Sequence, residues 1–129
     1  MEEKMADNKI IQAKKQISVY EGNLREARST LKGIEDLEDN FSHLNRNIER
    51  CLELLSSSVR NRKVTKMFEH MMYENKVSYR KTSYSLDEEK EFTRKKINKL
   101  SVDIDDLNKK IKEEYKKDKY NEEAKESKE

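Results

Sequence analysis

Proline and tryptophan are absent from this 129-residue sequence, and glycine occurs only at Gly22 and Gly33. Because proline and glycine are the residues least compatible with a helix interior, almost nothing in the chain interrupts an α-helix. No apolar run approaches the roughly 18 residues that a membrane-spanning helix needs, and the first residues form no apolar signal segment. The sequence therefore predicts long helices in a cytoplasmic protein that does not insert into membranes.

Residues that build catalytic or metal sites are also scarce. The two histidines, His43 and His70, and the one cysteine, Cys51, are too few for a zinc site, and no glycine-rich phosphate loop is present. We expect the many carboxylates to lie on solvated helix faces, where nothing shifts their pKa values as acid–base catalysis requires. The sequence thus predicts a non-enzymatic protein without a cofactor. Cys51 lies in a leucine-rich segment, so we expect a packed thiol.

Charged residues make up 43% of the sequence and apolar residues 33%, which suits narrow apolar stripes better than a globular core. The 29 basic residues nearly balance the 27 acidic residues, and this balance favours an ordered chain over a disordered one. A chain of this length forms one domain at most.

Apolar residues recur at alternating steps of three and four, the pattern of a helix with one apolar stripe. In the first half they are Ile10, Ile17, Tyr20, Leu24, Ala27, Leu31, Ile34, Leu37, Phe41, Leu44, Ile48, Leu52 and Leu55. In the second half they are Met72, Tyr79, Leu86, Ile97, Leu100, Ile104, Leu107 and Ile111. The polar segment 56–63 between the halves predicts a turn. The predicted fold class is all-α: a long, coiled-coil-like antiparallel two-helix hairpin over residues 10–118, with a flexible segment 1–9 and a charged, disordered tail 119–129.

A chain that folds back near position 60 brings together residues whose numbers sum to about 120. Phe41 then faces Tyr79, and Asn45 faces Asn75. A buried pair of asparagines fixes the register of two helices at some cost in stability, so Asn45 and Asn75 are the predicted register-setting residues.

The second arm allows an alternative with two helices. Ser85 followed by Glu88 fits a capping box, and the acidic residues of 87–91 suit a helix start. The second arm is then either one helix or two helices with a kink near residues 83–85.

The predicted turn combines an apolar surplus with a basic surplus. Residues 56–84 carry seven basic and two acidic side chains, and apolar doublets there broaden the stripe beyond what a two-helix contact covers. Methionine-rich surfaces adapt well to partner helices. The predicted partner-binding residues are Leu52, Leu55, Met67, Phe68, Met71, Met72, Tyr73, Arg60, Arg62 and Lys63. The alternatives are that the apolar residues only close the hairpin end and that the basic residues form a solvated turn.

Two stretches carry a resemblance to a known family: residues 68–75, which read FEHMMYEN, and residues 85–91, which read SLDEEKE and lead into a charged arm. With these stretches the chain resembles, over about residues 10–118, the small helical-hairpin accessory proteins of Gram-positive type VII secretion. These are WXG-like proteins encoded beside LXG-type toxins. The resemblance implies a hairpin that binds the helical N-terminal domain of such a toxin and helps to deliver it to the secretion machine.

Two departures from the family's pattern refine that expectation. The Trp-x-Gly turn of WXG-type hairpins is replaced by residues 58–61, which read SVRN. A Tyr-x-x-x-Asp/Glu export signal is missing from the C-terminal part, since only Tyr84 and Glu88 have that spacing. We therefore expect a partner that does not itself carry the export signal.

The leading hypothesis is an adaptor or targeting chaperone that packs against toxin helices, together with a second small helical hairpin in some complexes. It is cytoplasmic or exported with its partner, as a homo- or hetero-oligomer. A self-associating structural coiled coil is the first alternative. A small nucleic-acid-associated regulator is the second, and it is disfavoured because the basic residues are few and the whole chain is nearly neutral.

Overall fold

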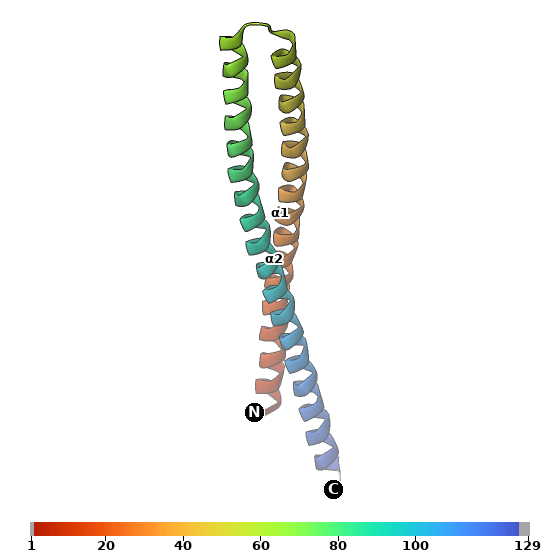
Figure 1. Cartoon of the computed structure of the whole chain (residues 1–129). Helices are drawn as coiled ribbons and strands as arrows, with labels where there is room; N and C mark the ends of the chain where they lie inside the picture. The colour runs from red at the N-terminus through yellow and green to blue at the C-terminus, as the bar shows by residue number, and fades with distance from the viewer. Residues whose placement is uncertain (1, 127–129) are drawn as a thin grey trace. The chain divides into compact units, whose positions relative to one another are not determined.

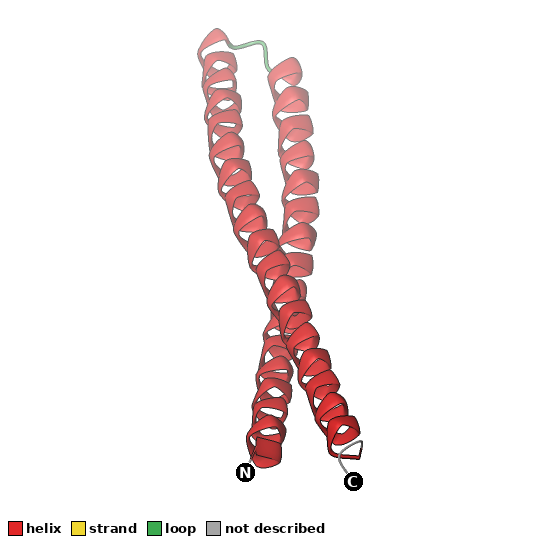
Figure 2. Cartoon of the chain, turned by 90° about the horizontal axis from the view of Figure 1, so that it is seen from below, coloured by secondary structure: helices red, strands yellow, loops and turns green. Residues whose placement is uncertain are grey.

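The computed structural model describes residues 2–126 and consists of two α-helices joined by a short loop (Figures 1 and 2). Helix α1 spans Glu2–Ser58 and helix α2 spans Arg62–Glu126. The described residues contain no β-strand. The predicted fold class, an all-α helical hairpin, is confirmed.

The turn comprises residues 59–61, inside the predicted range 56–63. Asn61 caps the start of α2, because its side-chain Oδ1 accepts a hydrogen bond from the backbone N–H of Lys63 at 3.0 Å. Its backbone oxygen accepts the first helical bond, from Thr65, also at 3.0 Å. At the end of α1, the hydroxyls of Ser57 and Ser58 donate to the carbonyl of Leu54 about one turn earlier, a common local hydrogen bond of helical serines. These serines, predicted as part of the turn, are therefore helical.

The structure differs from the sequence prediction at both ends of the hairpin. Residues 2–9, predicted to be flexible, begin α1, and residues 119–126, predicted to be disordered, continue α2. The remaining positions of those two segments, 1 and 127–129, lie outside the described residues. Both segments lack proline and glycine and consist largely of good helix formers, so each helix continues beyond the apolar stripe through which it contacts the other.

Helix α2 also runs without a break through residues 83–85, so the second arm is one helix. Ser85 is an exposed residue of its interior and begins no new helix. The capping-box pattern is overridden because Leu86, next along the chain, is half-buried and continues the contact with α1.

The chain divides into two compact units. The turn unit comprises Thr30–Arg94, and the terminal unit comprises Met1–Ser29 with Lys95–Glu129. Each unit holds a stretch of both helices. We call the row of side chains through which the helices contact each other the seam. Among the described side chains, those of Ile10, Ala27, Leu52, Leu100 and Thr93 are buried.

In the turn unit, the seam contains the predicted pairs. The rings of Phe41 and Tyr79 stack with centroids 5.3 Å apart and an angle of 11° between their planes. One helical turn nearer the loop, Asn75 Nδ2 donates to Asn45 Oδ1 at 2.9 Å. Both pairs have numbers that sum to 120, so the register of the turn unit is the one that symmetry about position 60 gives.

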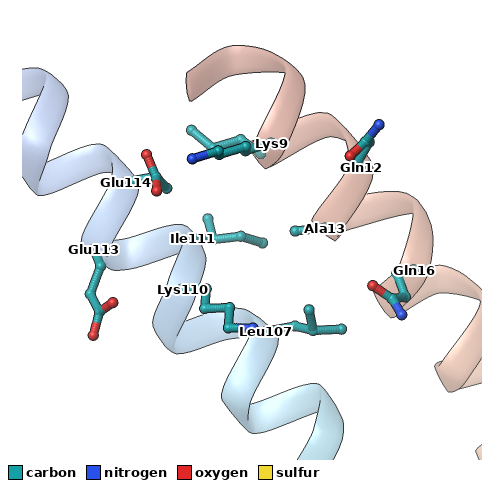
Figure 3. A pocket seen from close by; sticks show the side chains of 10 residues that line it. Lys9, Gln12, Ala13, Gln16, Leu107, Lys110, Ile111, Glu113 and Glu114 are labelled. Carbon is teal, nitrogen blue, oxygen red and sulfur yellow. The ribbon is translucent and has the colours of Figure 1, made fainter. Parts of the chain in front are cut away.

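In the terminal unit, small and medium-sized side chains leave the seam less filled. Figure 3 shows a hollow between the helices of this unit, where Ala13 lies opposite Leu107 and Ile111. Beside it, Lys14 Nζ lies 3.4 Å from the hydroxyl of Tyr115 and 6.0 Å from the centre of its ring. The ammonium therefore lies beside the hydroxyl edge of the ring, where it donates a hydrogen bond to the phenol oxygen at an exposed site.

Candidate protein-interaction surface

The structure places the ten predicted partner-binding residues in four locations. Leu52, Phe68 and Met72 lie in the seam, and Leu52 is only 8% exposed, so a partner cannot reach it without opening the hairpin. Leu55, Met67 and Met71 are exposed beside the seam on one side, and Tyr73 is exposed on the other. Arg60, Arg62 and Lys63 are exposed at the turn.

Cys51 is exposed, so the prediction of a packed thiol is wrong. The reason is helical geometry. Cys51 precedes the buried Leu52 by one residue, and one residue corresponds to a rotation of about 100° around the helix. While Leu52 contacts α2, the thiol of Cys51 turns to the side of the hairpin.

Helical rotation also places Ile48 and Leu55, two residues of the predicted apolar stripe, outside the seam. An α-helix drifts by about 20° per heptad relative to a strict 3.5-residue repeat. Along α1 toward the turn, this drift carries Ile48 and Leu55 out of the contact with α2. Their neighbours Glu49 and Ser56 move in, and these are the half-buried residues of that stretch.

The apolar residues that leave the seam collect on one side of the turn unit. In an antiparallel pair of α-helices, the residue that precedes a seam residue points to the same side of the pair on both helices. The second helix runs in the opposite direction and also faces its partner from the opposite direction, and these two reversals cancel. Eight exposed apolar residues precede buried or half-buried residues in this way, namely Phe92 and a set of seven nearer the turn: Leu37, Leu44, Ile48, Cys51, Leu55, Met67 and Met71. We call this set the apolar face. Its exposures, Cys51 aside, run from 37% at Ile48 to 64% at Met67.

The opposite side of the turn unit has a different chemistry. The exposed residues that follow seam residues there include a set of nine around the middle of the unit: Asp39, Arg46, Arg50, Glu53, Lys66, Glu69, Tyr73, Lys76 and Arg80. Eight of these nine are charged, which is the composition of a solvated helix surface. The two sides of the turn unit therefore differ, but the first side is apolar mainly on α1 and near the turn. Farther along α2 the same side carries exposed polar residues that also precede seam residues: Glu74, Ser78, Thr82 and Ser85.

Charge is also ordered along the turn unit. The basic turn, defined as residues 50–66, contains five basic residues and one acidic residue. The acidic band, defined as residues 35–39 with 87–91, contains eight acidic residues and one basic residue. The two halves of this band meet across the seam, because Lys90 Nζ lies 2.6 Å from Glu38 Oε2. The apolar face overlaps both regions along α1, since Leu37 lies within the acidic band and Cys51 and Leu55 lie within the basic turn.

Many of the charges have no partner within the chain. In the part of the chain that the structure describes, Arg60, Arg62 and Lys63 form no ion pair, and neither do Glu35 and Asp36. The charge separation along the turn unit is thus largely uncompensated within one hairpin.

Among the described positions 2–126, no three His, Cys, Asp or Glu side chains lie close enough together to hold a metal ion. His70 pairs with the exposed Glu74, one helical turn away, at 2.9 Å. Neither helix has, over its described length, a segment long and apolar enough to cross a membrane. The most distinctive surface of the described chain is therefore the apolar face.

Only part of the apolar face was predicted from the sequence as a partner-binding surface. Leu55, Met67 and Met71 were predicted to contact a partner, whereas Leu37, Leu44 and Ile48 were assigned to the seam. The signal that could identify them is their position one residue before a residue of the seam, which a strict heptad repeat does not locate because a 3.6-residue helix drifts relative to it. No family model matches the chain, and neither a curated protein nor a solved structure matches it.

Proposed function

We propose that this chain is a non-enzymatic adaptor that binds helices of another protein. The observation that supports this function is the apolar face. Monomeric soluble proteins rarely leave a contiguous row of large apolar side chains in water, and an amphipathic helix laid on such a row is a common solution. Its methionines, Met67 and Met71, have flexible side chains that adapt to different partner helices.

The partner we propose is the helical N-terminal domain of a secreted LXG-type toxin, and the adaptor enables the export of that toxin by type VII secretion. The resemblance of residues 68–75 and 85–91 to accessory proteins of this system supports that identity. The adaptor is then cytoplasmic before export, and a second small helical hairpin joins the complex in some cases.

The direct test is co-expression of the full chain with the N-terminal domain of the secreted helical protein encoded beside it, followed by light scattering during size-exclusion chromatography. We expect a complex that contains both chains. The variant Leu44→Glu, which puts a carboxylate on the apolar face, should weaken that complex strongly. The matched control Val102→Glu alters a similarly exposed apolar residue of the terminal unit and should not.

Export is tested separately by deleting the gene and measuring toxin in the culture medium. We expect the toxin to remain inside the cells and export to return with the wild-type gene. If no complex forms with any secreted helical protein and export is unchanged, the proposed function is wrong.

A self-associating coiled coil is the second candidate, because a second copy of this chain would also cover the exposed leucines of the apolar face on α1.

A further inference from the structure

Residues of like charge lie level with each other on the charged side of the turn unit, which is the side opposite the apolar face. Asn45 and Asn75 face each other across the seam and are joined by their hydrogen bond at 2.9 Å. The residues that follow them in the chain, Arg46 and Lys76, are both basic and exposed. Because a residue that follows a seam residue points to the charged side on both helices, these two cations lie on one side at one level of the hairpin. We call them the central basic pair.

Two further pairs on the charged side are acidic. Seven residues nearer the turn along α1, Glu53 lies level with Glu69 of α2. Eleven residues farther from the turn, Glu35 lies level with Asp87. We call them the near acidic pair and the far acidic pair. In the register of the two asparagines, they follow the facing seam residues Leu52 with Phe68 and Ile34 with Leu86.

The layer between the central basic pair and the far acidic pair adds one more cation. Ser42 and Arg80 follow the stacked rings of Phe41 and Tyr79, and neither is acidic. Other charged residues of this side, among them Lys66, Arg50 and Asp39, follow the alternate seam layers and point farther outward. Next to the seam, the charged side therefore reads acidic, basic, acidic along the turn unit.

This order of charge opposes the pairing of α1 with α2. The positions that flank the seam of a coiled coil are those where salt bridges between helices form, so opposite charges there would stabilise the hairpin. Like charges at neighbouring positions destabilise it instead. Of the six residues in the three pairs, only Asp87 forms an ion pair within the described chain, with Lys90 at 3.5 Å. The three pairs are thus arranged to attract charges from outside the hairpin.

We propose that the charged side binds a helix of another protein, one face of which carries basic, acidic and basic residues in that order at i, i+7 and i+18. Seven and eleven residues are close to two and three turns of a 3.6-residue helix, so these positions return to the same face. Along α1, the 18 steps from Glu53 to Glu35 span about 27 Å. One straight helix laid along the charged side therefore reaches all three pairs.

Two tyrosines supply contact area beside the charges. Tyr73 and Tyr84 of α2 follow half-buried residues on this side, and each is 67% exposed. Tyrosine is enriched at protein interfaces because its ring offers apolar surface while its hydroxyl can stay hydrated. A bound helix can cover both rings, which lie 11 residues, or about three turns, apart.

Neither nucleic acid nor a second copy of this chain matches the three pairs. A phosphate chain that runs along the hairpin would meet two acidic pairs and one basic pair, and carboxylates repel phosphates. The charged side of a second copy offers the order acidic, basic, acidic, which reads alike in both directions. No orientation of that side sets opposite charges against all three pairs, and like charges at an interface disfavour binding.

The first experiment uses two synthetic helical peptides of about 24 residues with identical composition. The matching peptide carries lysine pairs at i and i+18 and a glutamate pair at i+7, and the control peptide has the glutamate pair at i+18 instead. Fluorescence anisotropy with the full chain should give a Kd at least about tenfold lower for the matching peptide, and added salt should raise that Kd. Equal affinity for the two peptides, or binding of neither, overturns the proposal.

The second experiment locates the binding surface with charge reversals of equal size. Arg46→Glu combined with Lys76→Glu reverses the central basic pair and should abolish the preference for the matching peptide. Arg60→Glu combined with Lys63→Glu makes the same change of net charge at the turn and should retain the preference, as should Leu44→Glu on the apolar face. Circular dichroism verifies that all variants stay helical. Equal losses in both double variants would show that only net charge matters, and the proposal would be wrong.

The third experiment needs no partner. Lys76→Glu alone sets a carboxylate level with Arg46, so it should raise the denaturant midpoint of the hairpin while it weakens binding of the matching peptide. A lysine that served only to hold the hairpin together would give the opposite change in midpoint. Lys81→Glu, at an exposed position of the same helix, is the control and should alter neither quantity much. A lower midpoint for Lys76→Glu would refute the conflict of like charges.

This surface goes beyond the proposed adaptor function and can fail independently of it, because the apolar face and the charged side lie on opposite sides of the turn unit. If the toxin complex forms but the matching peptide is not preferred, the adaptor function stands and this inference does not. If the peptide is preferred but no secreted helical protein binds, the reverse holds. A dimer of this chain that dissociates with Arg46→Glu and Lys76→Glu but persists with Leu44→Glu would identify a second copy as the occupant and overturn the proposal.

Discussion

Lys90 Nζ lies 2.6 Å from Glu38 Oε2 across the seam of the turn unit, and it also lies 3.5 Å from Asp87 Oδ1 one helical turn away. The Lys90 side chain is 17% exposed, so its methylene groups pack against α1 while its charge meets two carboxylates. The hydrogen bond with Glu38 raises the pKa of Lys90 above its ordinary value of 10.5, although partial desolvation opposes the rise. This ion pair joins the two halves of the acidic band.

The raised pKa predicts how the contribution of Lys90 to stability depends on pH. A cation whose pKa is higher in the folded state stabilises that state fully below its unfolded pKa of about 10.5, and the contribution disappears as pH rises through the folded value. Lys90→Met should therefore lower the denaturant midpoint at neutral pH, and the difference from wild type should vanish well above pH 10.5. Lys32→Met, which changes an exposed lysine of α1, is the control. A difference that persists unchanged at high pH would contradict the ion-pair assignment.

The hydrogen bond between Asn75 and Asn45 predicts opposite effects for single and double substitutions. Asn75→Leu leaves the half-buried Asn45 amide facing an apolar side chain, which should cost about 1 kcal/mol of unfolding free energy. Replacing both residues with leucine should make the hairpin more stable than wild type but less specific in register. Denaturant unfolding measures the first effect, and extra amide signals in NMR spectra would report the second. A double variant less stable than either single variant would refute this role.

Gly33 lies within the continuous helix α1, and a Cβ atom added there meets nothing within 4 Å. Gly33→Ala should therefore raise the unfolding free energy by about 1 kcal/mol, since glycine in a helix interior costs that much relative to alanine. Gly22→Ala should give a similar gain, because its surroundings are equally open. Thermal unfolding followed by circular dichroism measures both. A loss of stability in either variant would mean that the glycine is needed for close packing with another molecule.

The hollow beside Ala13 in the terminal unit predicts a stabilising substitution. Ala13→Leu adds apolar atoms between Ile10, Leu107 and Ile111, which line the hollow. Burying them should raise the unfolding free energy by about 1 kcal/mol. Ser18→Leu, at an exposed position of the same helix, is the control and should have little effect. If Ala13→Leu destabilises the chain, the hollow is too narrow for the larger side chain.

The sequence predicted the fold because the fold depends on local properties. The apolar spacing of three and four, the missing proline and the polar segment 56–63 each indicate helix or turn from nearby residues alone. The pairs Phe41–Tyr79 and Asn45–Asn75 followed from the position of the turn, because a short loop leaves the two arms little freedom in register.

The surface was harder to predict because it depends on how far each helix has rotated. Leu44 and Leu52 look equivalent in the sequence, yet Leu52 is in the seam and Leu44 is exposed. A fixed heptad repeat does not include the drift of a 3.6-residue helix, which accumulates over several turns. The ends of the helices posed a different problem, since helical structure beyond the apolar stripe depends on intrinsic helix propensity.

The three-residue turn also has a kinetic consequence. Asn45 and Asn75 are 30 residues apart in the chain, whereas Lys14 and Tyr115 are 101 residues apart. Closing the longer loop first would cost about 1 kcal/mol more in chain entropy, because that cost grows with the logarithm of loop length. The hairpin should therefore begin to fold at the loop capped by Asn61 and zip toward its termini. In hydrogen exchange, amides near the chain ends should open first and those beside the seam of the turn unit last.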